Sequence, residues 1–436
     1  MRKDIALKRY LERHIEPSLP NAPQGMNHWQ HVLVIPAYDE SPELLGALSR
    51  LHGSEKILVI LVVNRPDSDP DTTRNKTLRD AINLLDPAYQ DAQNGINTYR
   101  LSASVELFYY DMEMIKGPSP AAQGVGLARK IGCDIALLWQ YQGAISSDWI
   151  CCSDADALLP KDYFCRLKKV FDASAAVFPF AHLAGTSKDV SEATALYELR
   201  LHHYVLGLNY AKSPYAYHTL GSCIAIKRQY YVQIRGYPKR SGGEDFYVLN
   251  KLAKVGLIAA LDGECIAIAS RRSHRVPFGT GPAVEKIISE NDLRIFYPPE
   301  CFESLRVFLA VVPKLKECPL EGLIPLLVAQ GLTPNLAQLT SDTLDKMNIS
   351  KAITHCLQHG KKEPQFVSQF NQWFDGFRTL KFIHAIRDGT AGMMCLEQIL
   401  SAQPALLPRP DSPTTEVEAL LRNIRKELGW TIETAH

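Results

Sequence analysis

Two aspartates one residue apart follow an apolar run in the middle of the chain. Residues 149–152 read WICC and suit a buried strand, and Asp154 and Asp156 come directly after it. In an extended chain residues i and i+2 point to the same side, so both carboxylates can face one point beyond the strand. Two close carboxylates repel each other, and a divalent cation relieves that repulsion. Ligation by oxygen alone predicts Mn²⁺ or Mg²⁺, whose shell substrate phosphates usually complete.

A second acidic pair opens an expected helix. In SGGEDFYVLNKL, two glycines precede Glu244 and Asp245. Acids at this place gain from the helix dipole, and helix capping alone would explain them. The glycines favour a loop that lets a ligand approach closely. We expect Asp245 to stay ionised near pH 7 and to accept a proton from a hydroxyl group.

A basic segment follows a strand-like run, in SRRSHRVPFGTG at residues 270–281. It carries three arginines and a histidine, which are Arg271, Arg272, Arg275 and His274. Three arginines in a short span can neutralise a pyrophosphate through bidentate contacts. His274 could ligate a metal or hold a phosphate, although a lone histidine more often does neither.

The glycines of GVGLARKIG, at residues 124–132, do not have the spacing of a nucleotide-binding fingerprint. We interpret them as allowing close entry into a helix, with Arg129 and Lys130 facing an anion. An isolated D-x-D triplet is more often the start of a surface turn. The interpretation of Asp154 and Asp156 therefore depends on these further segments.

The elements that position these residues alternate between strands and helices. Strands are predicted at 31–36, where Pro36 ends the apolar run, and at 56–64, 105–111 and 149–153, and helices near 41–52 and 124–142. This order predicts a parallel sheet covered by helices, which binds ligands at the carboxyl ends of its strands. From residue 160 to about 300 strands and helices are mixed, and after Pro298 and Pro299 the pattern is helical alone.

Composition narrows the class of protein. The 436 residues are 46% hydrophobic and 22% charged with a net charge of +1, so we expect a soluble globular protein and no nucleic acid partner. Ten scattered cysteines without a CxxC pair indicate reduced thiols and a cytoplasmic location. The charged N-terminus lacks the apolar core of a signal peptide. No apolar run reaches the roughly 18–20 residues of a transmembrane helix.

Taken together and in this order, the segments resemble the family 2 glycosyltransferases of the GT-A fold. VLVIPAYDES is similar to their first strand and nucleotide-binding loop, and ILVVN to their second strand. GVGLARKIGCDIAL resembles the helix before their metal motif, SDAD their DxD motif, and GGEDF the motif that supplies the catalytic base. The resemblance covers roughly residues 30–285. Within the family, GGEDF and SHRVPFGTG resemble a soluble bacterial subgroup.

The resemblance implies an α/β fold of the GT-A type, a Rossmann-like mixed sheet with helices on both faces, plus a C-terminal all-helical segment. We expect an N-terminal helical extension at 1–29, a GT-A domain at 30–299 and a helical domain at 300–436, which lies outside the resemblance. In QFNQWFDGFRTLKFIHAI, four phenylalanines at near-helical spacing predict one apolar face, buried on the GT-A domain or in a homodimer. They are Phe370, Phe374, Phe377 and Phe382.

For donor binding, the resemblance implies that Pro36, Tyr38 and Glu40 line the nucleoside pocket. Asn64 stands where many members have an aspartate that contacts uracil, so uridine follows from family habit alone. Further donor-binding residues, near the base or the phosphates, would be Arg129, Asp154, Arg271 and Arg275.

For the metal and the chemistry, the resemblance implies that Asp156 ligates Mn²⁺ or Mg²⁺ directly and that Asp154 lies near the metal or the ribose. His274 stands where some GT-A enzymes place a third metal ligand. Asp245 would be the catalytic base, and Glu244 would support it.

The implied activity is that of a metal-dependent, hexosyltransferase-like enzyme. It would move a sugar from a nucleoside-diphosphate sugar, with UDP expected, to an unknown acceptor hydroxyl with inversion. Three alternatives stay open. They are a retaining GT-A enzyme of the sugar-glycerate type, a sugar nucleotidyltransferase and a non-catalytic sugar-nucleotide-binding protein. PAYDES, standing where a nucleotidyltransferase has a glycine-rich loop, disfavours the second of these.

Overall fold

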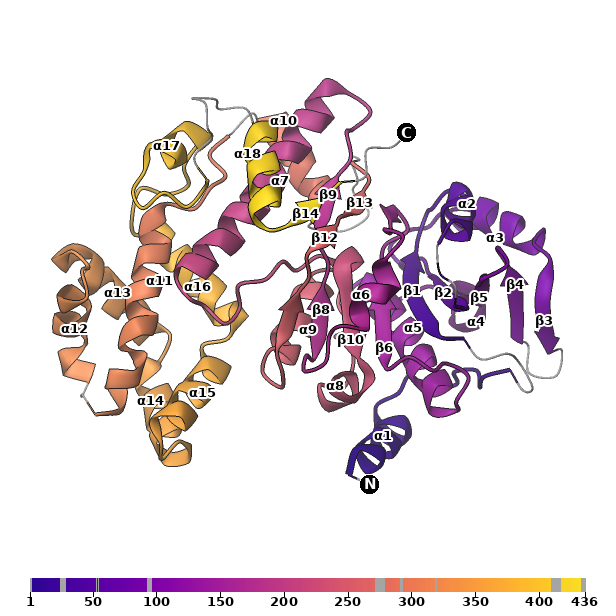
Figure 1. Cartoon of the computed structure of the whole chain (residues 1–436), viewed down its shortest axis with the longest axis horizontal. Coiled ribbons are helices and arrows are strands. Elements are labelled where there is room, and N and C mark those ends of the chain that lie inside the picture. The colour runs from indigo at the N-terminus through magenta and orange to yellow at the C-terminus, as the bar shows by residue number, and fades with distance from the viewer. Residues whose placement is uncertain are drawn as a thin grey trace. The chain divides into compact units, whose positions relative to one another are not determined.

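The computed structural model describes residues 2–23, 29–51, 53, 55–91, 96–270, 279–290, 293–317, 320–408 and 417–432. Its contacts divide the chain into two compact units, each built from separate stretches of sequence (Figure 1). The first comprises Met1–Ser191, Thr219–Glu285 and Gly429–His436. The second comprises Glu192–His218 and Lys286–Leu428.

A nine-stranded mixed sheet forms the centre of the first unit (Figure 1). In spatial order its strands are β11 (Ile258–Ala260), β8 (Ala175–Val177), β10 (Ile224–Lys227), β6 (Trp149–Cys152), β1 (His31–Ala37), β2 (Ile57–Val63), β5 (Val105–Asp111), β4 (Ile96–Arg100) and β3 (Pro87–Asp91). Strands β6, β1, β2 and β5 are parallel, whereas β10 runs antiparallel to β6 and β4 antiparallel to β5. The four parallel strands therefore end at one edge.

Burial on both sides explains why the two central strands are apolar apart from His31 at the start of β1. Every residue of β1 and β2 is buried. On one face, α5 (Gly124–Tyr141) lies so close that a side chain at Gly132 would collide with Val34. On the other face, the ring of Phe164 in α6 (Tyr163–Leu167) stacks on His31 at a centroid distance of 4.6 Å. The predicted α/β class, a mixed sheet with helices on both faces, is confirmed.

Shorter elements complete the first unit. Its other helices are α1 (Arg2–Arg13), α2 (Glu43–Ser49), α3 (Lys76–Asn83), α4 (Met112–Lys116), η1 (Gly221–Cys223), α8 (Arg228–Gln233) and α9 (Glu244–Leu252). A three-stranded sheet joins β7 (Ala157–Leu158), β13 (Ile266–Ile268) and β9 (Phe180–His182). A two-stranded sheet pairs β12 (Gly263–Glu264) with β14 (Trp430–Thr431).

Helices make up the second unit, as predicted for the C-terminal part. They are α11 (Pro299–Val311), η2 (Val312–Lys316), η3 (Leu320–Gly322), α12 (Leu323–Ala329), α13 (Pro334–Lys346), α14 (Ile349–His359), α15 (Glu363–Trp373), α16 (Gly376–Asp388), α17 (Leu396–Ser401) and α18 (Val417–Glu427). Helices α7 (Lys188–Tyr210) and α10 (Thr280–Glu290) continue from the first unit into the second. The strand β14 is a departure from the all-helical expectation.

The phenylalanine-rich segment differs from its prediction in two ways. It forms two helices, because Asp375 leaves the helical conformation and caps α16 through the backbone N–H of Arg378, at 3.0 Å. Phe370, Phe374 and Phe382 are buried within the helical core of the second unit itself, whereas Phe377 is partly exposed. Their burial therefore needs no second copy of the chain.

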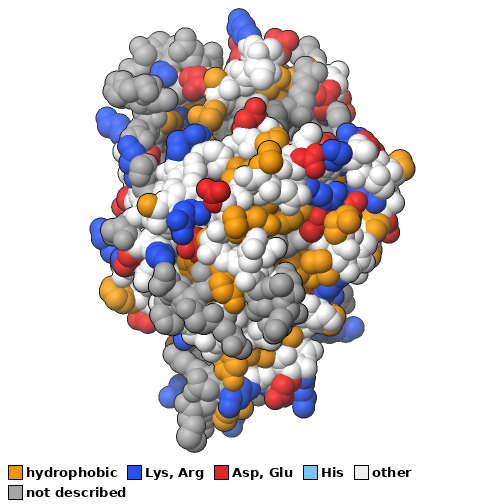
Figure 2. All heavy atoms as spheres, turned by 90° about the vertical axis from the view of Figure 1, so that its right-hand side faces the viewer, with side chains coloured by type: hydrophobic (Ala, Val, Ile, Leu, Met, Phe, Trp, Pro, Cys, Tyr) orange, Lys and Arg blue, Asp and Glu red, His pale blue; other side chains and the backbone are white. Residues whose placement is uncertain are grey.

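Among the described residues, no helix is both long and apolar enough to cross a membrane. The nine described cysteines are free thiols. Figure 2 shows one face of the molecule, on which acidic and basic side chains are interspersed with hydrophobic ones.

Candidate active site

The end of β6 brings the first predicted acid to a buried arginine. The N–H of Ser153 donates to the carbonyl of Val34 at 3.0 Å, so the chain stays attached to the sheet as it leaves the strand. Asp154 follows and is partly exposed, with Oδ1 at 2.5 Å from Nη2 of Arg129. Arg129 comes from α5 and is 2% exposed. The predicted Asp154 and Arg129 thus lie in direct contact.

The same arginine binds the second acidic motif. Nε of Arg129 donates to Oε1 of Glu244 at 2.8 Å, and Nη1 donates to the carbonyl of Ser153 at 3.3 Å. Glu244 is the first residue of α9 and is buried. Gly243 precedes it in the left-handed conformation, with φ of 66°, which glycine adopts without strain. The predicted helix start at Glu244 and Asp245 is confirmed.

The surroundings of Asp245 disfavour the ionised form of its carboxyl group. Burial, and after it the charge of Glu244, raises the pKa of Asp245 to about 7. The charge of Asp154 acts in the same direction, while the N–H of Phe246 and the charge of Arg129 oppose the shift. The expectation that the helix dipole keeps Asp245 fully ionised near pH 7 is therefore wrong. Desolvation and neighbouring carboxylates outweigh the dipole.

The glycines of residues 124–132 let a loop approach α5 closely. A Cβ at Gly126 would lie 2.5 Å from both the Arg240 nitrogen and the Pro238 oxygen. The N–H of Gly126 donates to the carbonyl of Arg240 at 2.9 Å. The loop at 238–241 leads directly into the GGED motif, so these glycines help to place it. Lys130 faces an anion as predicted, but that anion is Asp134 of the same helix, at 2.7 Å.

Asp156 lies beside the strand that leads to the basic segment. Its backbone carbonyl accepts the N–H of Ala269 at 3.0 Å, and β7 pairs antiparallel with β13. The side chain of Asp156 is partly exposed. Arg271, Arg272, His274 and Arg275 lie outside the described residues, so their predicted contacts with donor and metal remain predictions.

The carboxylates fit part of a magnesium or manganese site. Among the described residues, Asp154, Glu244 and Asp245 influence one another around Arg129, so these four side chains together have an excess of negative charge. A divalent cation would compensate that charge. Within the described ranges, however, no three His, Cys, Asp or Glu side chains are placed to hold a metal. The fit is that of an ion held by one or two carboxylates together with ligand phosphates.

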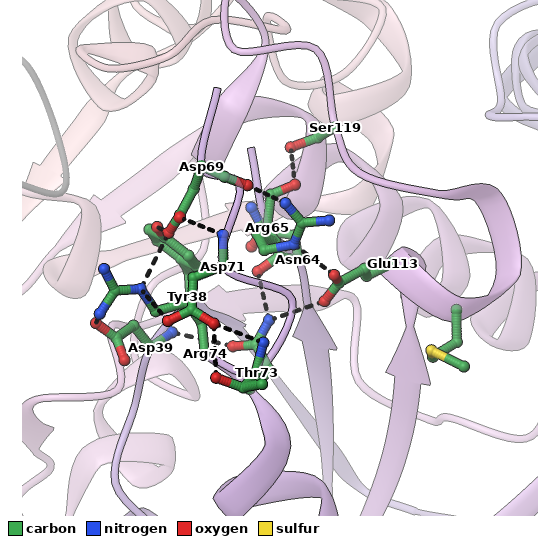
Figure 3. Close-up of polar contacts among 12 residues, drawn as sticks. Tyr38, Asp39, Asn64, Arg65, Asp69, Asp71, Thr73, Arg74, Glu113 and Ser119 are labelled. Atoms are coloured by element: carbon green, nitrogen blue, oxygen red, sulfur yellow. Dashed lines mark hydrogen bonds and ion pairs between the residues drawn. The ribbon is translucent and has the colours of Figure 1, made fainter. Parts of the chain in front are cut away.

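A second polar cluster lies beyond β1 and β2 at the same edge of the sheet (Figure 3). Asn64 is buried, and its N–H donates to the carbonyl of Ala37 at 3.0 Å. The hydroxyl of Tyr38 donates to the carboxylate of Asp69, which also binds Nε of Arg74 at 3.1 Å. Burial and this carboxylate raise the pKa of Tyr38 to about 12. The structure thus places Tyr38 and Asn64 at neighbouring strand ends.

Sequence reasoning missed the acids at the end of β5. Asp111 and Glu113 have the same i, i+2 spacing as Asp154 and Asp156, and this spacing could have singled them out. Arg79 binds both acids, at 2.7 and 2.5 Å, and Arg65 binds Glu113 at 2.5 Å. Burial alone would raise the pKa of Glu113, but these hydrogen bonds hold it below its ordinary value. Arginines therefore balance this pair within the protein.

Two further predicted donor residues, Pro36 and Glu40, lie on β1 and in the loop after it, near the polar cluster that contains Tyr38 and Asp69. Pro36 is a buried residue of β1 and pairs in register with Val62, and Glu40 is partly exposed in the loop after β1. The predicted role of these residues in lining a nucleoside pocket remains a prediction.

Comparisons with known proteins find similarity to solved structures alone. No protein-family model matches the chain, and no curated protein matches it. Among solved structures, one similar chain is a mannosyltransferase from Pyrobaculum calidifontis in complex with GDP-Man and Mn²⁺. It is 14% identical, with a TM-score of 0.33, and the match covers 88% of this chain and 92% of that chain. At this level of similarity, the function has to be inferred from the residues of this chain.

Proposed function

We propose that the chain is a metal-dependent glycosyltransferase that moves a sugar from a nucleoside-diphosphate sugar, with UDP expected, to an acceptor hydroxyl with inversion. The observation that carries this proposal is the double contact of Arg129 with Asp154 and Glu244. It ties a strand-end acidic motif to a helix-start acidic motif at the ligand-binding edge of an α/β sheet. Sugar transfer from such a donor needs both a binding site for the diphosphate and a proton acceptor for the acceptor hydroxyl.

In the proposed reaction, Asp245 accepts the proton of the acceptor hydroxyl while the acceptor oxygen forms a bond to the anomeric carbon. The bond from that carbon to the diphosphate oxygen breaks, and the nucleoside diphosphate leaves. A pKa of about 7 suits this role, because a base works best when its pKa lies near the working pH. Glu244 contributes by raising the pKa of Asp245.

Asp154 and Asp156 would hold Mn²⁺ or Mg²⁺ together with the donor diphosphate. The bound ion would offset the negative charge that develops on the departing diphosphate. Tyr38 and Asn64, at the ends of β1 and β2, are the proposed contacts of the nucleoside.

The test is a panel of nucleotide sugars incubated with Mn²⁺ or Mg²⁺, with donor turnover followed by mass spectrometry. We expect turnover of at least one donor and none in EDTA. Calorimetry with UDP should give binding that depends on Mn²⁺. Absence of both turnover and metal-dependent binding would refute the proposal. The anomeric configuration of the product distinguishes inversion from retention, and binding without turnover would favour a non-catalytic nucleotide-sugar protein.

A matched pair of variants tests the metal assignment. Asp156→Ala should remove the Mn²⁺-dependent part of UDP binding and leave the melting temperature nearly unchanged, because a partly exposed carboxylate contributes little to packing. Asp148→Ala is the control, since Asp148 precedes β6 at the opposite end of the same strand and pairs with Arg228 at 2.8 Å. Equal Mn²⁺ dependence in both variants would contradict the role of Asp156.

A further inference from the structure

The guanidinium group of Arg129 is buried and hydrogen-bonded on several sides, and the residues around it leave space for it. Three nitrogens of its guanidinium donate to three different groups, the carboxylates of Glu244 and Asp154 and the carbonyl of Ser153. The side chain is 2% exposed, whereas Asp154 is partly exposed, so a ligand meets Asp154 more readily than Arg129 itself. A planar guanidinium with fixed donor directions sets the positions of its partners in a way that a single ammonium cannot.

Gly221 explains how the guanidinium fits. A Cβ at this position would overlap Nη2 of Arg129 and lie 3.0 Å from its Cζ. Gly221 does not have the positive φ that would itself favour glycine. Space for the guanidinium is therefore what this position needs. Gly221 opens η1, which leads into β10, the strand that pairs with β6.

We propose that Arg129 is a positioning residue that fixes the carboxylates of Asp154 and Glu244 relative to each other. Asp154 belongs to the proposed metal motif and Glu244 to the proposed base motif. Gly221 leaves the space that the guanidinium group of Arg129 occupies. This inference rests on the proposed function and differs from the sequence-based expectation that Arg129 contacts the donor. The Asp245 that follows Glu244 and the Asp154 carboxylate then face the same bound donor. Loss of the bridge would let the end of β6 and the start of α9 move independently.

Two variants disturb the contacts of Arg129 with Asp154 and Glu244 by different routes. Arg129→Lys keeps the positive charge but loses the forked geometry of the guanidinium group. Gly221→Ala keeps the arginine but places a methyl group where its guanidinium lies. Removal of a group that orients metal ligands typically costs ~10–100-fold in metal affinity or activity. We expect both variants to weaken Mn²⁺ binding in the presence of UDP by about that factor, measured by electron paramagnetic resonance of free Mn²⁺. The double variant should lose no more than the single ones, because both changes act on one contact.

Arg425→Lys is the matched control. Arg425 is also buried and pairs with Glu198, a residue of the second unit. This variant should lower the melting temperature without changing Mn²⁺ affinity or turnover. If Gly221→Ala fails to fold, Arg129→Lys against Arg425→Lys decides the question. Mn²⁺ affinity and turnover in Arg129→Lys within about twofold of wild type would overturn the proposal.

A readout without ligand separates this inference from the proposed function. Amide hydrogen exchange at 153–154 and 244–246 should become faster in Arg129→Lys and Gly221→Ala, and should stay unchanged in Arg425→Lys. If wild-type protein neither binds Mn²⁺ with UDP nor turns over a donor, the proposed function fails. The exchange experiment then still decides whether Arg129 positions the two acids, and unchanged exchange would refute it.

Discussion

Glu244 and Asp245 are neighbours in sequence but are held differently. Glu244 is buried and paired with Arg129, so its negative charge is balanced at close range. Asp245 lies beside these charges and receives the N–H of Phe246 at 2.7 Å, yet its pKa rises to about 7. Near neutral pH, the carboxyl group of Asp245 is therefore present in both its protonated and its ionised form. A paired acid next to an acid with a raised pKa is an arrangement that separates a positioning carboxylate from a reactive one.

Asp245→Asn should lower turnover by ~10²–10⁴-fold, the usual worth of general-base assistance. The amide keeps the shape of the carboxylate but cannot take the proton. Donor affinity, measured by calorimetry with UDP and Mn²⁺, should stay close to that of wild type. Glu363→Gln, which changes a first-turn acid of α15, serves as the control. Loss of donor binding in Asp245→Asn would indicate a metal-site role, and full turnover would place the base elsewhere.

The raised pKa of Asp245 also predicts a pH-dependent stability. The unfolded chain releases this proton near pH ~3.9, whereas the folded protein holds it up to about pH 7. Between these values the folded state binds more protons, so the free energy of unfolding falls as pH rises. Asp245→Asn removes this loss. Its melting temperature in EDTA should therefore exceed that of wild type by more at pH 8 than at pH 5, as measured by scanning calorimetry. A pH-independent difference would contradict the raised pKa.

At the scale of elements, local patterns predicted the parts of the site but not their pairing. The apolar run WICC predicted the strand β6 and the acids at its end, and the glycines before Glu244 predicted the start of α9. The bond between Arg129 and Glu244 spans 115 positions, and it depends on how α5 and α9 pack around the sheet. Burial of Asp245 depends on the same packing. Spacing along one segment contains no such information.

Strand β14 shows the same limit for the fold. Its two residues are too few for a periodic pattern, and they form a strand only because β12 lies beside them. The N–H of Cys265 donates to the carbonyl of Thr431 at 2.8 Å, and the ring of Trp430 meets that of Phe180 at a centroid distance of 5.7 Å. β14 therefore supports the segment that continues into β13, the partner of the strand after Asp156.

We predict that a chain ending at Leu428 folds but binds its ligand less tightly. Removing β14 leaves the nine-stranded sheet intact and loosens β12, next to β13. The expected result is a weaker Mn²⁺-dependent affinity for UDP together with faster amide exchange at 263–268. A chain ending at Ile432, which keeps β14, is the control and should match wild type. Equal UDP affinity in the two chains would show that β14 has no influence on the site.

At the scale of the whole molecule, each unit is assembled from distant stretches of sequence. The predicted boundary at residue 300 follows the change from mixed to helical pattern, whereas the second unit also takes Glu192–His218 from earlier in the chain. The pattern could not reveal this because α7 is one continuous helix, and only its long-range contacts assign most of it to the helical core. Leu208 and Ala211 are buried in that core beside Phe302.

These contacts predict that the range 1–299 cannot be separated from the rest. The rings of Phe296 and Phe302 lie 5.4 and 5.5 Å from that of His203, and a side chain at Gly207 would overlap Phe302. Truncation at residue 299 removes Phe302 and the helices behind it, and exposes this apolar face of α7.

A chain of residues 1–299 should therefore aggregate or bind a hydrophobic dye, judged by size-exclusion chromatography and dye fluorescence, while the full chain does neither. The chain ending at Ile432 is again the control. A monomeric 1–299 chain with a cooperative melting transition would contradict this prediction. It would mean that the sheet of the first unit can fold while the α7 segment at 192–210 lacks its helical partners, and that the contacts of α7 add little to the stability of the sheet.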